Sequence, residues 1–256
     1  MGVSAQSHSL WLAYDKPKPE SRLRLFCFPY SGADASVFAA WQASVPDDIE
    51  ICPVQLPGRG RRLAEPFVTS LDSLIVQTAQ ALRTDFESKP FALFGHSLGA
   101  LICFELARYL RGHYAHMPVH LFVSGCGAPD VLPRENRIHD LCEAEFLDKL
   151  RHMNGSLQRL LCEPELQQIF VPILRADFEL FETYLYREEL PLDCAISAFG
   201  GLQDDWVQRG HLESWRRHTT RSFSLRMLPG DHLFVSGSRD ELLRALVGQL
   251  TYPNRT

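Results

Sequence analysis

One serine in the sequence has the surroundings of a nucleophile. Ser97 is the central residue of 95–99 (GHSLG), which fits the pattern G-x-S-x-G. An apolar run at 91–94 directly precedes this segment, and an apolar helical pattern at 98–110 directly follows it. The two glycines permit a sharp turn from strand to helix, which would lift the serine hydroxyl above the sheet. The helix N-terminus there would favour an anion. The segment therefore predicts a serine that attacks a carbonyl carbon.

A base and an acid for this serine lie near the end of the chain. A serine hydroxyl is a weak nucleophile until a base takes its proton. His232 follows the strand pattern 223–228 directly, and we predict it as the base. The acid that fixes the imidazole tautomer should follow the preceding strand, where Asp204 and Asp205 are neighbours. We predict Asp204 and keep Asp205 as the alternative. The order serine, acid, histidine is that of the α/β-hydrolases.

The negative charge that develops on an attacked carbonyl oxygen needs two backbone N–H donors. In the α/β-hydrolase arrangement, one donor is the residue after the nucleophile, which is Leu98 here. The other comes from the loop after the first core strand, which is 29–33 (PYSGA) in this chain. We predict Ser31 as this second donor, with Tyr30 as the alternative.

Apolar runs and helical patterns alternate along most of the chain, and the elements they predict would position these groups. We expect strands at 23–28, 49–54, 91–94, 119–123, 194–199 and 223–228. We expect helices at 36–45, 71–86, 98–110 and 239–250. Pro53 favours an edge position or a bend for the second strand. Such alternation predicts an α/β-hydrolase fold, with a mostly parallel central sheet and helices on both faces.

The alternation stops between the fourth and fifth strands. Only helical patterns occur there, at 143–153, 155–161 and 164–186. We expect a helical lid insertion at 130–190 within a single domain that spans 1–256. Apolar side chains of the lid would help to enclose a substrate. The residues that we predict to bind the substrate are Tyr30, Met153, Phe178 and Phe181.

Composition places the chain among ordinary globular enzymes. It has 256 residues, 45% hydrophobic residues and a net charge of −5, which argues against a general affinity for nucleic acid or an anionic membrane. Seven cysteines without a CxxC pair indicate reduced thiols, and the polar N-terminus has no signal-peptide pattern. No run is long enough for a membrane span. We expect a cytoplasmic monomer without a cofactor or metal.

Taken together, the motifs resemble the type II thioesterases that accompany nonribosomal peptide and polyketide synthases. The resemblance runs from about residue 25 to residue 250. Besides the serine motif, the segments that carry it are 27–32 (CFPYSG), 55–59 (QLPGR), 174–178 (LRADF), 182–184 (ETY), 200–204 (GGLQD) and 230–234 (GDHLF). The chain departs from the family pattern at Ala33, where a second glycine is common, and at Asp205, where proline is common. Neither departure removes a catalytic group.

The resemblance implies a substrate and a partner. The substrate would be an acyl group in thioester linkage to the phosphopantetheine arm of a carrier protein. The enzyme would act in editing, by removing stalled or wrong acyl groups. Since the chain has its own Met1 and no attached carrier domain, we expect it to act in trans. The basic residues Arg59, Arg61 and Arg62 could meet an acidic carrier, or they could form a solvated loop.

Three other functions stay open at this point. A general carboxylesterase or lipase would use the same triad, prefer oxyesters and ignore carrier proteins. A non-catalytic binding protein could be built on a hydrolase fold, although it would have no need for all three triad residues. A cyclising or acyl-transferring thioesterase would normally form the end of a synthase chain.

Overall fold

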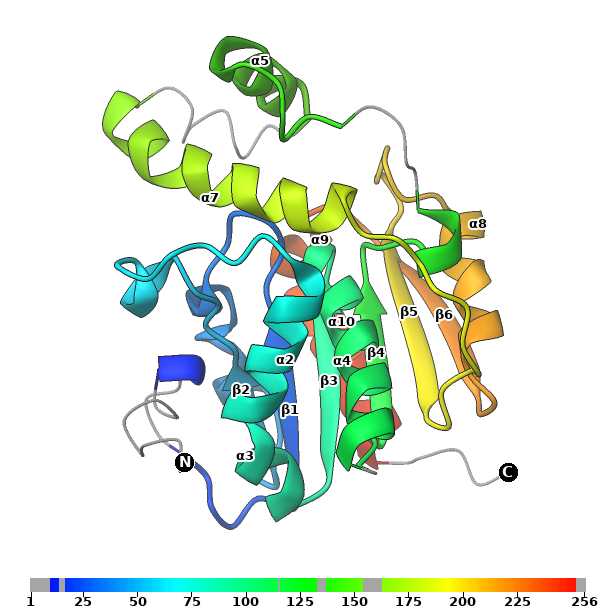
Figure 1. The fold of residues 1–256 in the computed structure, drawn as a ribbon. Coiled ribbons are helices and arrows are strands. Elements are labelled where there is room, and N and C mark those ends of the chain that lie inside the picture. Colours follow the sequence, from blue (N-terminus) through cyan, green and yellow to red (C-terminus); the bar gives the residue numbers. More distant parts are fainter. Residues whose placement is uncertain (1–9, 14–16, 115, 133–136, 154–162, 252–256) are drawn as a thin grey trace.

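The computed structural model describes residues 10–13, 17–114, 116–132, 137–153 and 163–251 (Figure 1). Its centre is a six-stranded sheet in which every pairing is parallel, in the order β2-β1-β3-β4-β5-β6. The strands are β1 (Leu23–Phe28), β2 (Ile49–Pro53), β3 (Phe91–His96), β4 (His120–Ser124), β5 (Ala195–Gly201) and β6 (Phe223–Leu228). All six predicted strands are confirmed with bounds within two residues, and so is the α/β fold class.

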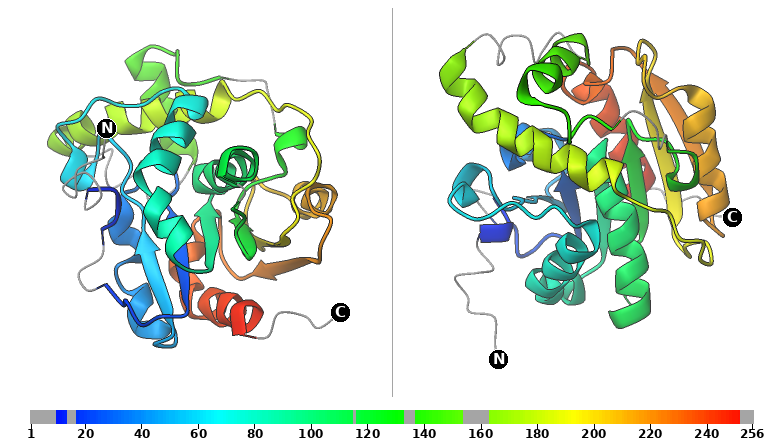
Figure 2. Two further views of the ribbon diagram at one scale, coloured as in Figure 1. Left: turned by 60° about the horizontal axis from the view of Figure 1, so that its bottom comes forward. Right: turned by 45° about the horizontal axis from the view of Figure 1, so that its top comes forward.

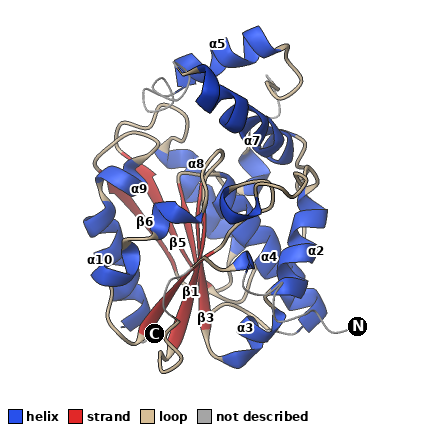
Figure 3. Cartoon of the chain, turned by 90° about the vertical axis from the view of Figure 1, so that its left-hand side faces the viewer, coloured by secondary structure: helices blue, strands red, loops and turns tan. Residues whose placement is uncertain are grey.

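Both faces of the sheet are covered, because side chains alternate along each strand (Figure 3). In β1, Phe26 and Phe28 join one hydrophobic cluster, and Leu25 and Cys27 join the other. The helices that pack on the first face are α2 (Leu71–Ala81), α3 (Arg83–Ser88), α4 (Leu98–Tyr114) and α8 (Arg209–Glu213), the last followed by the 3-10 helix η5 (Ser214–His218). Those on the second face are η1 (Ala35–Phe38), η2 (Trp41–Ser44), α9 (Phe234–Gly237) and α10 (Arg239–Thr251).

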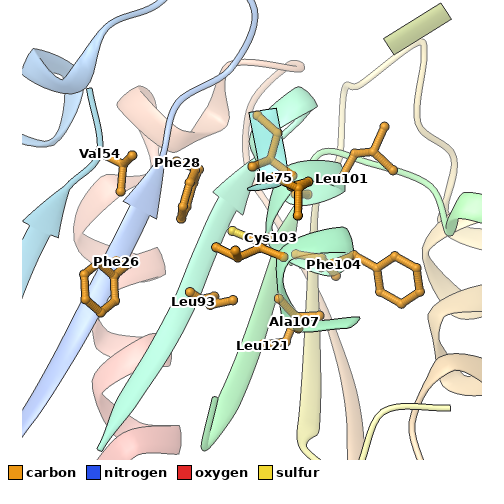
Figure 4. Packing of buried hydrophobic residues seen from close by; sticks show 14 of the residues in the cluster. Phe26, Phe28, Val54, Ile75, Leu93, Leu101, Cys103, Phe104, Ala107 and Leu121 are labelled. Carbon is orange, nitrogen blue, oxygen red and sulfur yellow. The ribbon is translucent and has the colours of Figure 1, made fainter. Parts of the chain in front are cut away.

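Helix α4 is the centre of the first layer. Its residues Leu101, Cys103, Phe104 and Ala107 are all buried in the hydrophobic cluster that α4 forms with the sheet, with helix α2 and, through Phe104, with η5 (Figure 4). This burial explains why its sequence is apolar nearly all round. The helix is therefore a rigid base for the serine motif that immediately precedes it.

Five of the six described cysteines are buried, and all six are free thiols.

Two predicted helices are each divided into two in the structure. The segment 36–45 forms the two 3-10 helices η1 and η2 instead of one α-helix. Gln42 explains the second of these, because its side chain bonds the backbone of β2 at Ile49 (3.1 Å) and Ile51 (2.9 Å), which holds η2 against the edge strand. The helix predicted at 71–86 is interrupted at Leu82, which is fully buried and divides α2 from α3.

Strand β2 lies at one edge of the sheet, as Pro53 predicts. A short N-terminal segment covers its outer side. Leu12 forms an antiparallel bridge with Val54. The N–H of Ala13 donates to the carbonyl oxygen of Pro53, and the N–H of Gln55 donates to that of Trp11, both at 2.9 Å. The edge strand therefore has part of its backbone paired on the outer side.

The segment between β4 and β5 contributes the 3-10 helix η4 (Pro129–Val131), α5 (Glu143–Met153) and α7 (Pro164–Glu182). Helix α7 runs above the sheet, with α5 stacked on its outer side (Figures 1 and 2). Together they have their own hydrophobic cluster, which includes Ile138, Phe146, Leu150, Val171 and Leu174. The helix predicted at 155–161 lies outside the described residues. We refer to α5 and α7 as the insertion helices.

Candidate active site

The turn that carries Ser97 requires glycine on both sides. A Cβ atom on Gly95 would lie 2.0 Å from the carbonyl oxygen of Gly99, and a Cβ on Gly99 would lie 2.2 Å from that of Phe28. Ser97 has φ of 53°, and among the described residues it is the only non-glycine residue with a positive φ. Such backbone strain is typical of functional sites. The strand and the helix thus meet in a turn that holds the half-buried Ser97 in one position.

His96 connects this turn to the loop of the predicted base. It is fully buried, and its Nε2 donates a hydrogen bond to the carbonyl oxygen of His232 at 2.8 Å. Its Nδ1 accepts from the hydroxyl of Ser124 at 2.9 Å. Burial, together with the charge of His232, lowers the pKa of His96 to about 3, so the ring is neutral. Sequence reasoning missed this role, although His96 is the direct neighbour of Ser97.

The structure brings Asp204 and His232 together. Nδ1 of His232 donates to Oδ2 of Asp204 at 2.8 Å, while Asp205 is exposed. The other carboxylate oxygen of Asp204 accepts from the N–H groups of Trp206 (2.9 Å) and Val207 (3.1 Å). Burial acts to raise the pKa of Asp204, but the hydrogen bonds from His232 and these N–H groups hold it below its ordinary value. With Nδ1 as donor, the neutral imidazole has Nε2 as acceptor, which a base requires.

Trp206 is a second neighbour of the imidazole that sequence reasoning missed. Its ring centroid lies 4.7 Å from that of His232, with an angle of 43° between the planes. The backbone N–H of Trp206 bonds Asp204, so the same turn positions the acid and the indole. Trp206 is still 39% exposed, which is unusual for such a large apolar side chain.

Two backbone N–H groups of the loop after β1 donate hydrogen bonds within the protein. The N–H of Ala33 donates to the carbonyl oxygen of Tyr30 at 3.0 Å, and the N–H of Gly32 donates to Oδ2 of Asp177 at 2.7 Å. Both predicted candidates for the second oxyanion donor, Ser31 and Tyr30, precede these residues. Leu98 is the first residue of α4, where N–H groups have no acceptor within the helix.

The residues predicted to bind a substrate take different positions. Tyr30 is half-buried, and its ring lies edge-on to His96 with a centroid distance of 5.7 Å. Phe178 packs edge-on against Phe146 of α5 at 6.0 Å, and Phe181 packs against the main core. Met153 ends α5, and its side chain lies outside the described part of the chain. A role of these residues in substrate binding stays a prediction.

Both interpretations of the arginines at 59–62, a surface for an acidic carrier and a solvated loop, are wrong for Arg59 and Arg62. Arg59 and Arg62 are 4% and 6% exposed. Arg59 forms a bidentate pair with Asp177, and Arg62 pairs with Glu65 and donates to the carbonyl oxygen of Gln55. Only Arg61 of this group is exposed. The sequence gives no indication of the pair with Asp177, since 118 residues separate the partners.

Two further properties concern only the described residues. These residues contain no group of three or more histidine, cysteine, aspartate or glutamate side chains that could hold a metal ion. Among the helices that the structure describes, none combines the length and the apolarity that a membrane crossing requires.

Comparisons with known proteins agree with this geometry. Residues 23–250 match a family model described as "Thioesterase domain". "Linear gramicidin dehydrogenase LgrE" of Brevibacillus parabrevis is 44% identical over 247 residues, which cover 95% of this chain and 94% of that protein. "Gramicidin S biosynthesis protein GrsT" of Aneurinibacillus migulanus is 41% identical over 240 residues, which cover 94% and 93%. The solved structure of the type II thioesterase BorB from the borrelidin biosynthetic cluster has a TM-score of 0.86 at 31% identity, covering 94% of this chain and 98% of BorB.

The family match includes the residues of the sheet, the serine motif and the insertion helices in one continuous span. It confirms the resemblance drawn from the motifs, and with it the assignment as a thioester hydrolase with an α/β-hydrolase fold. The chain belongs to the thioesterase family and is close to the type II thioesterases of nonribosomal peptide and polyketide pathways.

Proposed function

We propose that the chain is a stand-alone editing thioesterase that removes acyl groups from the phosphopantetheine arm of carrier proteins in a nonribosomal peptide or polyketide synthase. The observation that carries the proposal is the contact of His232 with Asp204, linked through His96 to the strained Ser97 in a member of the thioesterase family. Relatives named for gramicidin S and borrelidin biosynthesis support the synthase as the source of the substrate.

The first half-reaction would transfer the acyl group to the enzyme. Nε2 of His232 takes the hydroxyl proton of Ser97 as Oγ attacks the thioester carbonyl carbon. The N–H groups of Leu98 and Ser31 hold the oxyanion of the tetrahedral intermediate. The carbon–sulfur bond then breaks, His232 gives the proton to the sulfur, and pantetheine leaves as a thiol.

The second half-reaction would release the acyl group as a carboxylic acid. His232 takes a proton from a water molecule, which attacks the acyl-Ser97 ester. The oxyanion forms again at the same two N–H groups, and Ser97 leaves with the proton from His232. Asp204 stays ionised throughout and stabilises the imidazolium in both halves. This cycle needs no cofactor.

The remaining assignments belong to the same proposal. The insertion helices would act as a lid within a single domain, and Tyr30, Phe178 and Phe181 would line the acyl site together with Met153. The carrier protein would be a separate chain, encountered in the cytoplasm by a monomeric enzyme. These assignments follow from the resemblance and from the position of α7 above the sheet.

The test uses an acyl-phosphopantetheinyl carrier protein and follows its intact mass. The wild-type protein should remove the acyl mass, and Ser97→Ala should leave the carrier unchanged. A simple oxyester serves as a competing substrate, and its cleavage should be slower. An unchanged carrier together with rapid oxyester cleavage would instead identify a general carboxylesterase. If neither substrate reacts, the binding-protein alternative gains support and the proposal fails.

A further inference from the structure

A buried ion pair connects insertion helix α7 to the loops at the carboxyl end of the sheet. The two side chains of the pair, Arg59 and Asp177, are 5% and 0% exposed. Nη1 of Arg59 donates to Oδ2 of Asp177, and Nη2 donates to Oδ1, both at 2.6 Å. This bidentate geometry fixes the orientation of both planar groups, so the pair holds the two segments that carry them in one relative position.

The same carboxylate also holds the turn after β1. Oδ2 of Asp177 accepts the N–H of Gly32 at 2.7 Å. Gly32 has φ of 81°, and the hydrogen bond from Ala33 to Tyr30 closes the turn around it, as in a type II turn. Helix α7 lies directly against this turn, because a Cβ atom on Gly32 would come within 2.6 Å of Leu174.

Arg59 extends the connection to the loop after β2. Its Nη1 also donates to the carbonyl oxygen of Ala33 at 3.3 Å, and its Nε donates to that of Pro57 at 3.4 Å. The side chain of Gln55 holds the backbone of the arginine, because its Nε2 donates to the carbonyl oxygen of Arg59 at 3.0 Å. One guanidinium therefore joins two loops and one helix that are distant in the sequence.

On its other side, the turn after β1 rests on the serine motif. A Cβ on Gly99 would lie 2.2 Å from the carbonyl oxygen of Phe28 and 2.8 Å from that of Pro29. The backbone of the nucleophile turn and the backbone that leads into the loop are thus in direct contact. Residues 29–33 are held between Gly99 on one side and Leu174 with Asp177 on the other.

Stability alone does not explain a charged pair at this place. Well-packed apolar residues often replace a buried ion pair without loss of stability. What an apolar side chain lacks is an acceptor for the N–H of Gly32. Type I and type II turns differ by a flip of their central peptide, which here is the peptide between Ser31 and Gly32. Asp177 holds this peptide in the orientation that the type II turn requires.

We propose that Asp177 is a positioning residue for the oxyanion hole. From insertion helix α7, and with Arg59 as its support, it fixes the loop that presents the N–H groups of Tyr30 and Ser31. The inference rests on the proposed function, because it takes this loop and Leu98 as the oxyanion donors. It implies that the hole is complete only while this part of α7 is docked on the sheet.

The decisive variant removes the acceptor without leaving a buried charge. In the double variant Arg59→Met/Asp177→Leu, both charges and the Gly32 contact are lost while apolar packing is kept. We expect kcat for 4-nitrophenyl butyrate to fall about 10- to 100-fold with KM within about 2-fold of wild type, since a displaced oxyanion donor weakens transition-state binding only. A stable double variant with wild-type kcat would overturn the proposal.

The single variant Asp177→Ala covers the case in which the double variant does not fold, since it removes the acceptor for the Gly32 N–H with one substitution, and its kcat should fall as in the double variant. Its kcat is measured below its own melting temperature. A matched control is Glu50→Gln, which alters the buried pair with Arg24 (2.8 Å) at the opposite end of the sheet. Glu50→Gln should lower the melting temperature and leave kcat unchanged. If Asp177→Ala also loses melting temperature only, the pair is structural and the proposal is wrong.

The ester substrate separates this proposal from the proposed function. Any acyl transfer to Ser97 needs the oxyanion hole, whatever the natural acyl donor is. A wild-type protein that cleaves the ester but not the acyl carrier refutes the carrier as substrate, and the fall in kcat of the variants still tests Asp177. A wild-type protein that cleaves neither substrate refutes both proposals.

Discussion

Each end of the sheet has a buried arginine that pairs with carboxylates, and the two sets of ion pairs connect different parts of the molecule. At the amino end, Arg24 of β1 pairs with Glu50 of β2 at 2.8 Å and with Asp85 of α3 at 3.0 Å. At the carboxyl end, Arg59 pairs with Asp177. Both arginines neutralise carboxylates that are nearly inaccessible to water. The first connects regular elements, and the second connects irregular loops to an insertion.

The difference between the two ends shows that loops, unlike strands and helices, need side-chain contacts to become rigid. Strands and helices satisfy their own backbone groups, so an ion pair between them mainly fixes the packing. Loops do not, and binding and catalytic groups are usually placed on loops. Substitutions at the amino end should therefore change stability, while substitutions at the carboxyl end should change activity. The following predictions test this division, from the largest expected effect to the smallest.

Asp204→Asn should produce the largest effect on activity. The amide cannot hold the imidazole in the tautomer that leaves Nε2 as acceptor, and we expect kcat to fall about 10⁴-fold. The melting temperature should change little. Steady-state kinetics on a thioester and a thermal melt followed by circular dichroism measure the two quantities.

Asp205→Asn is the matched control for this substitution, because Asp205 is the exposed neighbour. Its kcat should equal that of the wild type. Equal losses in the two variants would contradict the assignment of Asp204 as the acid, and a loss confined to Asp205→Asn would reverse it.

Arg24→Met should be the largest change at the amino end. It leaves Glu50 and Asp85 buried without their cation, and we expect about 3–5 kcal/mol less free energy of unfolding. Urea denaturation gives this quantity, and kcat measured in the absence of urea should not change. The control is Arg22→Met, which removes an exposed pair with Asp48 and should cost less than about 1 kcal/mol. A large loss of kcat in Arg24→Met would contradict the division between the ends.

Two buried histidines, one at each end of the sheet, should make the protein sensitive to acid. Burial lowers the pKa of His96, at the end of β3, to about 3, and that of His120, at the start of β4, to about 4. Below the ordinary value of 6.5 the unfolded chain binds protons that the folded chain does not. Stability is therefore complete above about pH 6.5 and falls with decreasing pH, by up to about 1.4 kcal/mol per pH unit for each histidine.

Variants separate the two histidines. His120→Gln should reduce the slope of unfolding free energy against pH between 6.5 and 4 and keep kcat unchanged, because its contacts are Ser197 and Phe122. His96→Asn should reduce the slope and also lower kcat, because it loses the bond to the His232 carbonyl. Urea titrations at several pH values measure the slopes. Unchanged slopes in both variants would show that other groups control the acid response.

Trp206→Ala should have the smallest effect among the predictions for the acid, the amino-end ion pair, the buried histidines and this tryptophan. Its indole lies against His232, and an aromatic ring beside an imidazolium contributes about 1 kcal/mol, so kcat/KM should fall about 3- to 10-fold. Trp206→Phe should recover most of this loss. Trp215→Phe is a control, because that indole is fully buried and bonds the Cys126 carbonyl. It should lower the melting temperature and preserve kcat/KM. The opposite pattern in the two tryptophans would contradict the prediction.

Local patterns in the sequence were enough to predict the strands and the turn that carries Ser97. The six apolar runs and the two glycines around Ser97 each fix a backbone conformation over a few residues. The expected chain order placed the acid after the fifth strand, with Asp204 as the prediction and Asp205 as the alternative, and the structure shows that Asp204 contacts His232.

Contacts between distant residues were not predictable in this way. Arg59 follows a glycine in a polar segment, which is typical of a solvated loop, and its partner is on the insertion helix. Two 3-10 helices replace a predicted helix, and the second of them is held by the bonds of Gln42 to the edge strand. The role of His96 depends on where the loop of His232 lies, and that position is set by the packing of β6 and α9.

The segment that covers the outer side of β2 has a consequence for solubility. The unpaired backbone groups of an edge strand are a template for a strand from a second molecule, which is how many sheets begin to aggregate. Trp11, Leu12 and Ala13 occupy this template along residues 53–55. At the other edge of the sheet, β6 carries the exposed charge of Arg226. A truncation beyond Ala13 would therefore favour intermolecular association through β2 even if the catalytic groups were intact.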